Sequence, residues 1–159
     1  MKPDSLWHSV TAMNDIVFRR ASVDDAALLA KMEKENFSDP WNEETLKRVL
    51  ENAATHFIIA EIDGHAVAYG GMNIVFEDCD IINLAVDSDF RRCGIGKALV
   101  SQMLDVCRSV GVESVFLEHR ESNISAAALY EKFGFEKYAI RKNYYTSPVE
   151  NAILRVLHL

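Results

Sequence analysis

The stretch of residues 82–99, INLAVDSDFRRCGIGKAL, constrains the fold of this chain more than any other segment. An apolar, strand-like run ends in acidic turn residues, and two arginines, two spaced glycines and a helical pattern follow. Glycine lets backbone N–H groups converge on a charged ligand, and a helix N-terminus carries a partial positive charge. The stretch therefore predicts a strand, a tight turn and a helix that together form an anion-binding site.

Two common anion-binding motifs do not match the segment Gly94-Ile95-Gly96-Lys97. The early glycine of a P-loop is absent, and Ala98 stands where a Ser or Thr would bind magnesium. Leu99 occupies the position of the third glycine of a dinucleotide fingerprint. A P-loop is excluded on these grounds, and a Rossmann-type oxidoreductase is a poor alternative.

Strand and helix signals alternate along the rest of the chain. Asp63-Gly64 is typical of a two-residue hairpin turn, and Gly70-Gly71 within a strand predicts a bulge or a close backbone approach. Phe37 should line the core side of the first helix. The expected elements are a strand at 16–20, a helix capped by Ser22 with Asp25, a helix capped by Asn42, strands at 56–62, 66–76 and up to Val86, a helix at 94–110, a strand at 113–119, a helix at 124–133, and an antiparallel pair at 135–141 and 152–157.

This order predicts an α+β fold, a mixed and mostly antiparallel sheet covered by helices, rather than a doubly wound one. The strand–helix–strand unit at its centre should be a right-handed parallel crossover. The 159 residues are enough for one core, so we expect a single domain at 16–159. Residues 1–15 are weakly patterned and form a lead-in that is either flexible or packed on the domain.

Composition excludes several classes of function. The net charge of −7 argues against non-specific nucleic-acid binding, which requires a basic face. No apolar run approaches the roughly 18 residues of a membrane span. The three cysteines form no metal-like pair and predict reduced thiols in a cytoplasmic protein. The five histidines show no ligand spacing, so we expect no metal site.

The segment 91–96 resembles the Q/R-x-x-G-x-G/A signature of the GNAT family of N-acetyltransferases, and residues 84–86 and 123–135 resemble the same family. The resemblance covers residues 16–159. It implies helices on both faces of the sheet, a splayed parallel central pair of strands and acetyl-CoA as co-substrate. The implied cofactor-binding residues are Leu84, Ala85 and Val86 for the pantetheine and the thioester carbonyl, Arg91, Arg92, Cys93, Gly94, Ile95, Gly96 and Lys97 for the phosphates, and Asn123.

A narrower resemblance is to the bacterial ribosomal-protein-alanine N-acetyltransferases, carried by Pro40-Trp41 and by residues 117–120, 122–123 and 141–145. One departure is His119, where an aliphatic residue is usual. Strand alternation puts His119 on the face opposite Glu118, so we expect little catalytic consequence. The stretch 143–148 should form a loop with two adjacent aromatic residues.

Two residues are implied in catalysis. Glu118, near the end of a predicted central strand, is a candidate general base, and the alternative is a salt bridge to Arg120 or a lysine. Asn123, Ala126, Ala127 and Tyr130 share one helix face by their spacing, which alone favours an ordinary Ala-rich core face. Beside the anion site, Tyr130 becomes a candidate proton donor for the departing thiolate. We read Cys93 as a backbone contributor rather than a nucleophile.

The resemblance implies acetylation of a protein N-terminus, the alanine terminus of a small-subunit ribosomal protein, by direct attack of the amine on the thioester. Trp41, Tyr144 and Tyr145 would shape the peptide site, although Trp41 alone fits a loop aromatic that covers the core. The alternatives are acetylation of a lysine side chain or small amine, and a non-catalytic acyl-CoA-binding module. We expect a monomer or weak dimer without nucleic-acid or membrane partners.

Overall fold

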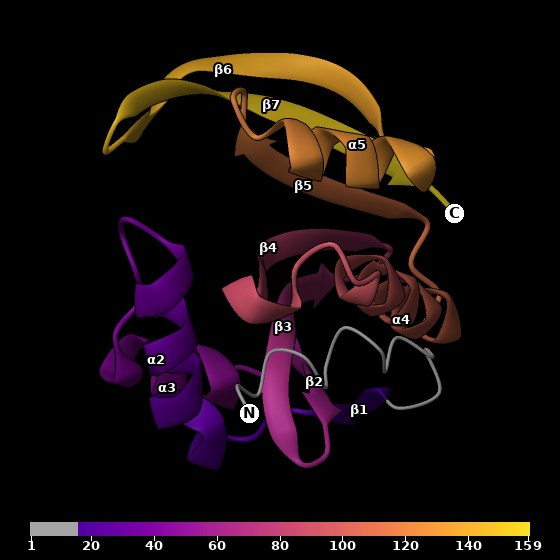
Figure 1. Cartoon of the computed structure of the whole chain (residues 1–159). Helices are drawn as coiled ribbons and strands as arrows, with labels where there is room; N and C mark the ends of the chain where they lie inside the picture. Colours follow the sequence, from indigo (N-terminus) through magenta and orange to yellow (C-terminus); the bar gives the residue numbers. More distant parts are fainter. Residues whose placement is uncertain (1–15) are drawn as a thin grey trace.

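The computed structural model describes residues 16–159, so the expectation for the lead-in at 1–15 lies outside the described residues. A single seven-stranded sheet has the order β1-β2-β3-β4-β5-β7-β6 (Figure 1). The elements are β1 (Ile16–Arg20), α2 (Ala26–Asn36), α3 (Glu43–Glu51), β2 (Thr55–Ile62), β3 (His65–Val75), β4 (Asp78–Val86), α4 (Ile95–Ser109), β5 (Ser114–Arg120), α5 (Ile124–Lys132), β6 (Glu136–Thr146) and β7 (Val149–His158).

Helix caps form where the sequence predicted them. The Asp25 carboxylate accepts from the Ser22 N–H at 2.8 Å, and the Asn42 side chain accepts from the Thr45 N–H at 2.8 Å. Each bond satisfies a backbone donor at the start of a helical segment, which stabilises that start by about 1 kcal/mol. Phe37 was wrongly expected in the core: α2 ends at Asn36, the backbone of Phe37 is extended, and its side chain is exposed.

Strands β2, β3 and β4 form the predicted antiparallel meander. A Cβ atom on Gly70 would lie 2.5 Å from the sulfur of Met103, and one on Gly71 would lie 2.6 Å from the Phe57 ring. Both faces of β3 are therefore packed too closely for a side chain at these positions. The pairing also shifts between Gly71 and Met72, which leaves Ile82 of β4 as an extra, bulged residue.

The parallel pair β4–β5 is short, and its strands diverge. Three residue pairs join them, from Asp78 with Ser114 to Asp80 with Phe116. Beyond these positions β4 continues to Val86 and β5 to Arg120 with no described pairing between them, as the ribbons of Figure 1 show. This confirms the splayed central pair, and it leaves one edge of β4 open inside the sheet.

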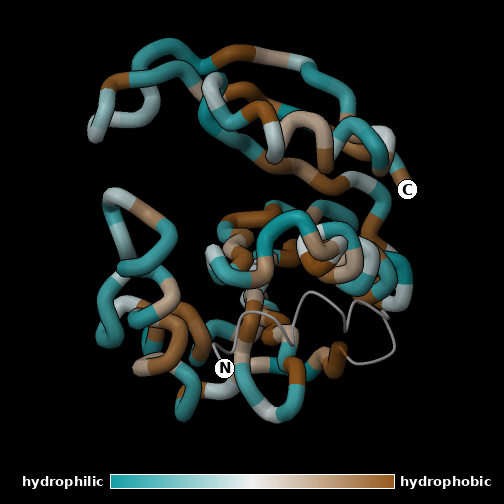
Figure 2. Tube along the Cα trace, in the orientation of Figure 1, coloured by the Kyte–Doolittle hydropathy of each residue, from teal (hydrophilic) through white to brown (hydrophobic). Residues whose placement is uncertain are grey.

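Two hydrophobic clusters lie on opposite faces of the sheet. Successive residues of β2 contribute to different clusters. Ile58 belongs to the cluster under α4 and α5, and Ile59 belongs to the cluster under α2 and α3. In the trace of Figure 2, hydrophobic stretches run along central strands and along the helices next to them. Helices thus cover both faces of a mixed sheet, and the predicted fold class is confirmed. No helix among residues 16–159 is long and apolar enough to cross a membrane.

The C-terminal hairpin differs from the prediction. Residues 143–146 do not form a loop, because β6 extends to Thr146 and only Ser147 and Pro148 separate it from β7. The β6–β7 register shifts between Arg141 and Tyr145, and Asn143 adopts a φ of 53° there. The side chain of Asn151 accepts from the Asn143 N–H at 3.0 Å, which holds this irregular backbone in place.

Candidate active site

The N-terminus of α4 lies where the sequence predicted an anion site. Gly94 precedes the helix with a φ of 80°, which favours glycine, and it offers no side chain to cap the helix. The first helical bond runs from the Ala98 N–H to the Gly94 carbonyl at 3.0 Å. The N–H groups of residues 95–97 therefore have no acceptor within the helix and can bind an anion.

Gly96 brings three elements of the site close together. A Cβ atom added there would contact Val86 of β4 at 3.7 Å and Leu129 of α5 at 3.5 Å. The start of α4, the end of β4 and the middle of α5 therefore meet at one point. The sequence predicted residues 84–86 and 94–97 as parts of one site, and the structure places Val86 next to Gly96. Their joint role in binding stays a prediction.

The open edge of β4 presents a backbone donor at Val86. The Asp87 N–H donates to the Val67 carbonyl of β3 at 2.8 Å, and successive residues of a strand direct their N–H groups to opposite edges. The Val86 N–H therefore points to the edge from which β5 has diverged. Consistent with this, the Val86 carbonyl accepts from Arg91 Nε at 3.2 Å rather than from β3.

The two adjacent arginines differ in their contacts. Besides Val86, the Arg91 guanidinium binds Oδ1 of Asn36 at 2.9 Å, so it joins the anion site to the end of α2. Arg92 is exposed and, unusually for a residue with a side chain, has a φ of 61°. Cys93 is half-buried, and its thiol donates to the Arg91 carbonyl at 3.5 Å. Of the two guanidinium groups, only that of Arg92 is free of described protein contacts.

Tyr130 lies on the buried face of α5. Asn123 caps this helix by accepting from the Ala126 N–H at 3.1 Å, as the sequence predicted. The Tyr130 ring packs between His119 of β5, at a centroid distance of 6.0 Å, and Phe135, at 5.7 Å. Burial raises the pKa of Tyr130 to about 12. Its hydroxyl has no described hydrogen bond and is not sealed from solvent, so it remains available to a ligand.

Glu118 lies on the opposite face of β5, and its side chain is 34% exposed. Its carboxylate is 3.8 Å from Arg141, so the ion pair expected with Arg120 or a lysine is formed with a different residue. A hydrogen bond to Glu118 is the main reason that the pKa of Tyr144 is raised. Burial, the charge of Asp78 and the charge of Glu118 raise the pKa of Asp80. Glu118 is thus the centre of an open, polar cluster.

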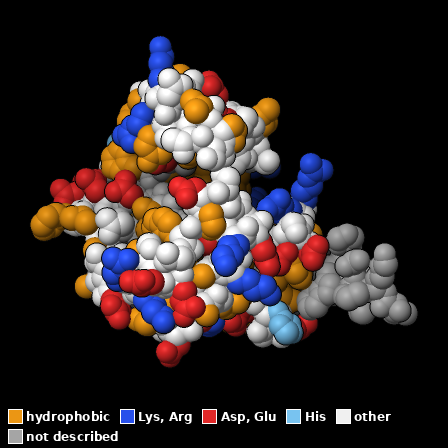
Figure 3. All heavy atoms as spheres, turned by 90° about the vertical axis from the view of Figure 1, so that its left-hand side faces the viewer, with side chains coloured by type: hydrophobic (Ala, Val, Ile, Leu, Met, Phe, Trp, Pro, Cys, Tyr) orange, Lys and Arg blue, Asp and Glu red, His pale blue; other side chains and the backbone are white. Residues whose placement is uncertain are grey.

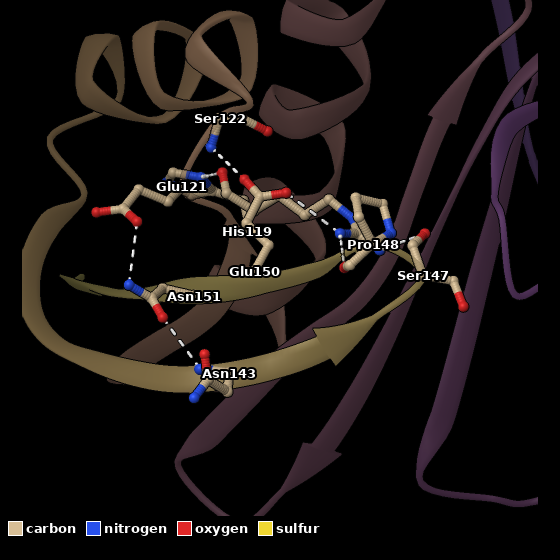
Figure 4. A network of polar contacts seen from close by, with 9 residues as sticks. His119, Glu121, Ser122, Asn143, Ser147, Pro148, Glu150 and Asn151 are labelled. Atoms are coloured by element: carbon tan, nitrogen blue, oxygen red, sulfur yellow. Dashed lines mark hydrogen bonds and ion pairs between the residues drawn. The ribbon is translucent and has the colours of Figure 1, made fainter.

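Figure 4 shows the network that holds the β6–β7 hairpin beside this cluster. Arg120 donates to the carbonyls of Pro148 at 3.0 Å and Ser147 at 3.3 Å, and to Glu150 at 3.2 Å. Its guanidinium also lies 4.4 Å from the centre of the Tyr145 ring. The second oxygen of Glu150 accepts from the Ser122 N–H at 2.5 Å, next to the start of α5. The hairpin that carries the tyrosines is therefore anchored to β5 and α5.

Trp41 lies apart from these tyrosines in the described contacts. It is partly buried and packs against the hydrophobic cluster under α2 and α3. This contact fits the alternative given for it from the sequence, a loop aromatic that covers the core. On the face seen in Figure 3, acidic and hydrophobic side chains lie side by side at mid-height, where the upper and lower parts of the molecule meet. The described contacts thus join Glu118 to Tyr144, whereas the proximity of Trp41 stays a prediction.

Sequence reasoning missed Glu33, which is 1% exposed. The Tyr69 hydroxyl donates to its carboxylate at 2.6 Å, and the Asn83 side-chain amide of β4 donates to the same oxygen. Burial raises the pKa of Glu33, while these donors and the Trp41 backbone lower it. Its spacing of four residues from the buried Leu29 was the available signal, but charges in the surrounding KMEKEN segment are typical of a solvated face.

Residues 26–135 match the sequence profile described as "Acetyltransferase (GNAT) family", and the chain therefore belongs to this family of acetyl-transferring enzymes. GNAT acetyltransferases use acetyl-CoA. Among residues 16–159 no group of three or more His, Cys, Asp or Glu side chains is arranged to hold a metal ion.

The chain is also similar to individual members of the family. The chain is 36% identical over 120 residues to the Escherichia coli (strain K12) "[Ribosomal protein bS18]-alanine N-acetyltransferase", covering 74% of this chain and 80% of the relative. The Salmonella typhimurium protein of the same name is 32% identical over 140 residues, covering 86% and 93%.

Solved structures agree with the fold. The crystal structure of the ribosomal-protein-S18-alanine N-acetyltransferase from Escherichia coli superimposes with a TM-score of 0.84 at 30% identity, covering 90% of this chain and 93% of that one. Arabidopsis thaliana NAA60 in complex with acetyl-CoA superimposes with a TM-score of 0.81 at 20% identity, covering 91% and 99%, and shares the fold.

Proposed function

We propose that this protein is an Nα-acetyltransferase that transfers the acetyl group of acetyl-CoA to a protein N-terminal amine, the terminal alanine of a small-subunit ribosomal protein. The observation that carries the proposal is the open N–H edge of β4 at Val86, with Tyr130 and Glu118 on the two faces of the neighbouring strand. The named activity of the relatives supports the choice of acceptor.

The donor fits the backbone groups of the site. The free N–H groups of residues 95–97, with the exposed Arg92 and Lys97, would hold the pyrophosphate at the helix N-terminus. Residues 84–86 would hold the pantetheine arm, and the Val86 N–H would polarise the thioester carbonyl as negative charge develops on its oxygen. The thioester supplies the acetyl group, and these protein groups only bind and orient it.

Glu118 would accept the proton of the attacking amine, directly or through water. An α-amino group has a pKa of about 7.7–8.0, whereas that of a lysine side chain is about 10.4, so a carboxylate deprotonates a terminus more easily. The open position of Glu118 leaves it accessible to an incoming peptide. Tyr144 and Tyr145 on the anchored hairpin, and Trp41 on the α2–α3 connection, would form the walls of the peptide site.

Tyr130 would protonate the leaving group. The amine nitrogen forms a bond to the acetyl carbon, the carbon–sulfur bond breaks, and the sulfur takes the phenolic proton while Glu118 holds the proton of the amine. The raised pKa of Tyr130 keeps its hydroxyl protonated at neutral pH. Because Glu118 and Tyr130 lie on opposite faces of β5, base and acid can act from opposite sides of one thioester.

The proposal is tested with acetyl-CoA and three acceptors: a peptide with a free N-terminal alanine, the same peptide with a blocked terminus and an internal lysine, and a polyamine. Mass spectrometry then locates the acetyl group. We expect acetylation of the free terminus. Comparable turnover of the lysine peptide or the polyamine would replace this acceptor with a side-chain or small amine. Binding of acetyl-CoA without turnover of any acceptor would indicate a non-catalytic module.

A further inference from the structure

We propose that His119 and Arg155, a buried pair joining β5 to β7, are positioning residues that fix the ring of Tyr130 for proton transfer. The proposal rests on the acid role of Tyr130 in the proposed function. It also revises the sequence expectation that His119, placed on the face opposite Glu118, has little consequence for catalysis.

Both nitrogens of His119 are engaged. Nδ1 lies 2.8 Å from the Arg120 carbonyl oxygen, and Nε2 lies 2.9 Å from Nε of Arg155. A carbonyl only accepts and a guanidinium only donates, so Nδ1 carries the hydrogen and Nε2 accepts. The ring is therefore neutral and held in one tautomer. An aliphatic side chain at this position could fill the space but could not accept from Arg155.

Arg155 is the hub of the arrangement. Like His119 it is only 6% exposed, and its three nitrogens bind three different partners. Besides His119, it donates to the Phe135 carbonyl at 3.3 Å and to the Glu131 carboxylate at 3.0 Å. One buried guanidinium thus ties β7 to β5, to the last turn of α5 and to Phe135, in the connection between α5 and β6.

The partners of Arg155 enclose Tyr130. The His119 and Phe135 rings pack on the Tyr130 ring at 6.0 and 5.7 Å, and Glu131 is its neighbour in the chain. No hydrogen bond is described for the hydroxyl of the buried Tyr130. The position of its oxygen therefore depends on the contacts of the ring. Proton transfer requires the donor oxygen within hydrogen-bond reach of the sulfur, and a displacement of 1 Å can cost about a hundredfold in rate.

Protonation of His119 would oppose this arrangement, because Nε2–H would face Nε–H of Arg155. The pKa of His119 is lowered, mainly by burial and further by the charge of Arg155, while the hydrogen bond with the Arg120 carbonyl and the charge of Glu131 act in the opposite direction. The described groups that face the ring are the Arg155 guanidinium, the Arg120 carbonyl and the Tyr130 ring. The neutral form is therefore the working form at neutral pH.

The test is a double-mutant cycle with His119→Leu, Tyr130→Phe and both together, assayed over a range of concentrations of acetyl-CoA and of the free-terminus peptide. We expect His119→Leu to lower kcat about tenfold with little change in either KM, because binding groups are untouched. In the Tyr130→Phe background it should have no further effect, since there is no phenolic proton left to position. His119→Gln, whose amide oxygen can accept from Arg155, should recover part of the loss.

Val115→Ala is the matched control, because Val115 is buried on the same face of β5 and is four residues away from His119 along the strand. It should lower Tm without this selective loss of kcat. Full activity of His119→Leu, or an equal loss in both backgrounds, would overturn the positioning role. Full activity of Tyr130→Phe alone would instead overturn the acid role in the proposed function. If His119→Leu does not fold, the same cycle with Arg155→Lys in place of His119→Leu decides the question by the same criteria.

Discussion

The two faces of β5 hold their polar groups in different ways. On the face toward α5, the contacts of His119 and Arg155 are buried, multiple and directed at Tyr130. On the other face, Glu118 and Arg141 approach only to 3.8 Å and remain open to solvent. Electrostatic interactions are strong where water is excluded and weak where it is present. The buried face is therefore suited to fixing a geometry, and the open face to receiving a changing partner.

The largest expected effect is on the open face. Glu118→Gln keeps the size of the side chain but removes the proton acceptor, so kcat should fall by about two to three orders of magnitude. The pH profile should change as well, while the affinity for acetyl-CoA, measured by calorimetry, should stay near that of the wild type. Unchanged turnover would remove Glu118 from the mechanism, and the open face of β5 would then have no catalytic role to compare with the buried face.

Next in size is Tyr130→Phe on the buried face. The ring and its packing against His119 and Phe135 are kept, and only the hydroxyl is lost, so kcat should fall by about a hundredfold with the fold intact. Steady-state kinetics with measured cofactor affinity provides the test. A variant with full activity would show that the leaving thiolate takes its proton from elsewhere.

The effects on stability of replacing one arginine on each face should differ. Arg155→Ala leaves the Phe135 carbonyl and His119 Nε2 without their donor and should lower the free energy of unfolding by about 2–3 kcal/mol. Arg141, whose side chain is 55% exposed, should cost less than about 0.5 kcal/mol on replacement by alanine. Urea denaturation of both variants measures the contrast, and equal effects would contradict it.

The smallest expected effect is on the pH dependence of stability and comes from Glu33, the buried carboxylate of α2. Its pKa in the folded state is raised above the ordinary value of 4.5, so the folded protein binds its proton more tightly than the unfolded chain. The contribution of this group to stability is therefore largest at low pH and decreases as pH rises from about 4.5 through the raised pKa. Glu33→Gln should lack this decrease, and Glu35→Gln, an exposed neighbour, should retain it. Denaturation at several pH values gives the two slopes.

Local patterns in the sequence were sufficient for much of the fold. Neighbouring residues determine the Asn42 cap, the hairpin turn at Asp63-Gly64 and the glycine before α4, and all three were predicted. The close approach at Gly70-Gly71 was also predicted, since a glycine pair within a strand has few other causes.

Contacts between distant residues were beyond such reasoning. His119 and Arg155 are 36 residues apart, as are Glu33 and Tyr69, and neither pair leaves a periodic signal. The irregular backbone at Asn143 was missed for the same reason, because Asn151 on the partner strand holds it. Roles assigned through the family resemblance, including those of Glu118 and Tyr130, remain predictions that the kinetic experiments address.

The divergence of β4 from β5 also affects association with other chains. An unpaired strand edge on the outside of a sheet is a template for aggregation, because any extended segment can pair with it. The unpaired edge at residues 81–86 lies between two strands of the same sheet, which remain joined at Asp78–Asp80. A foreign strand would have to enter between β4 and β5, and the junction at Asp78–Asp80 closes one end of this space. The unpaired backbone groups of β4 are thus open to a small ligand but shielded from pairing with other protein molecules.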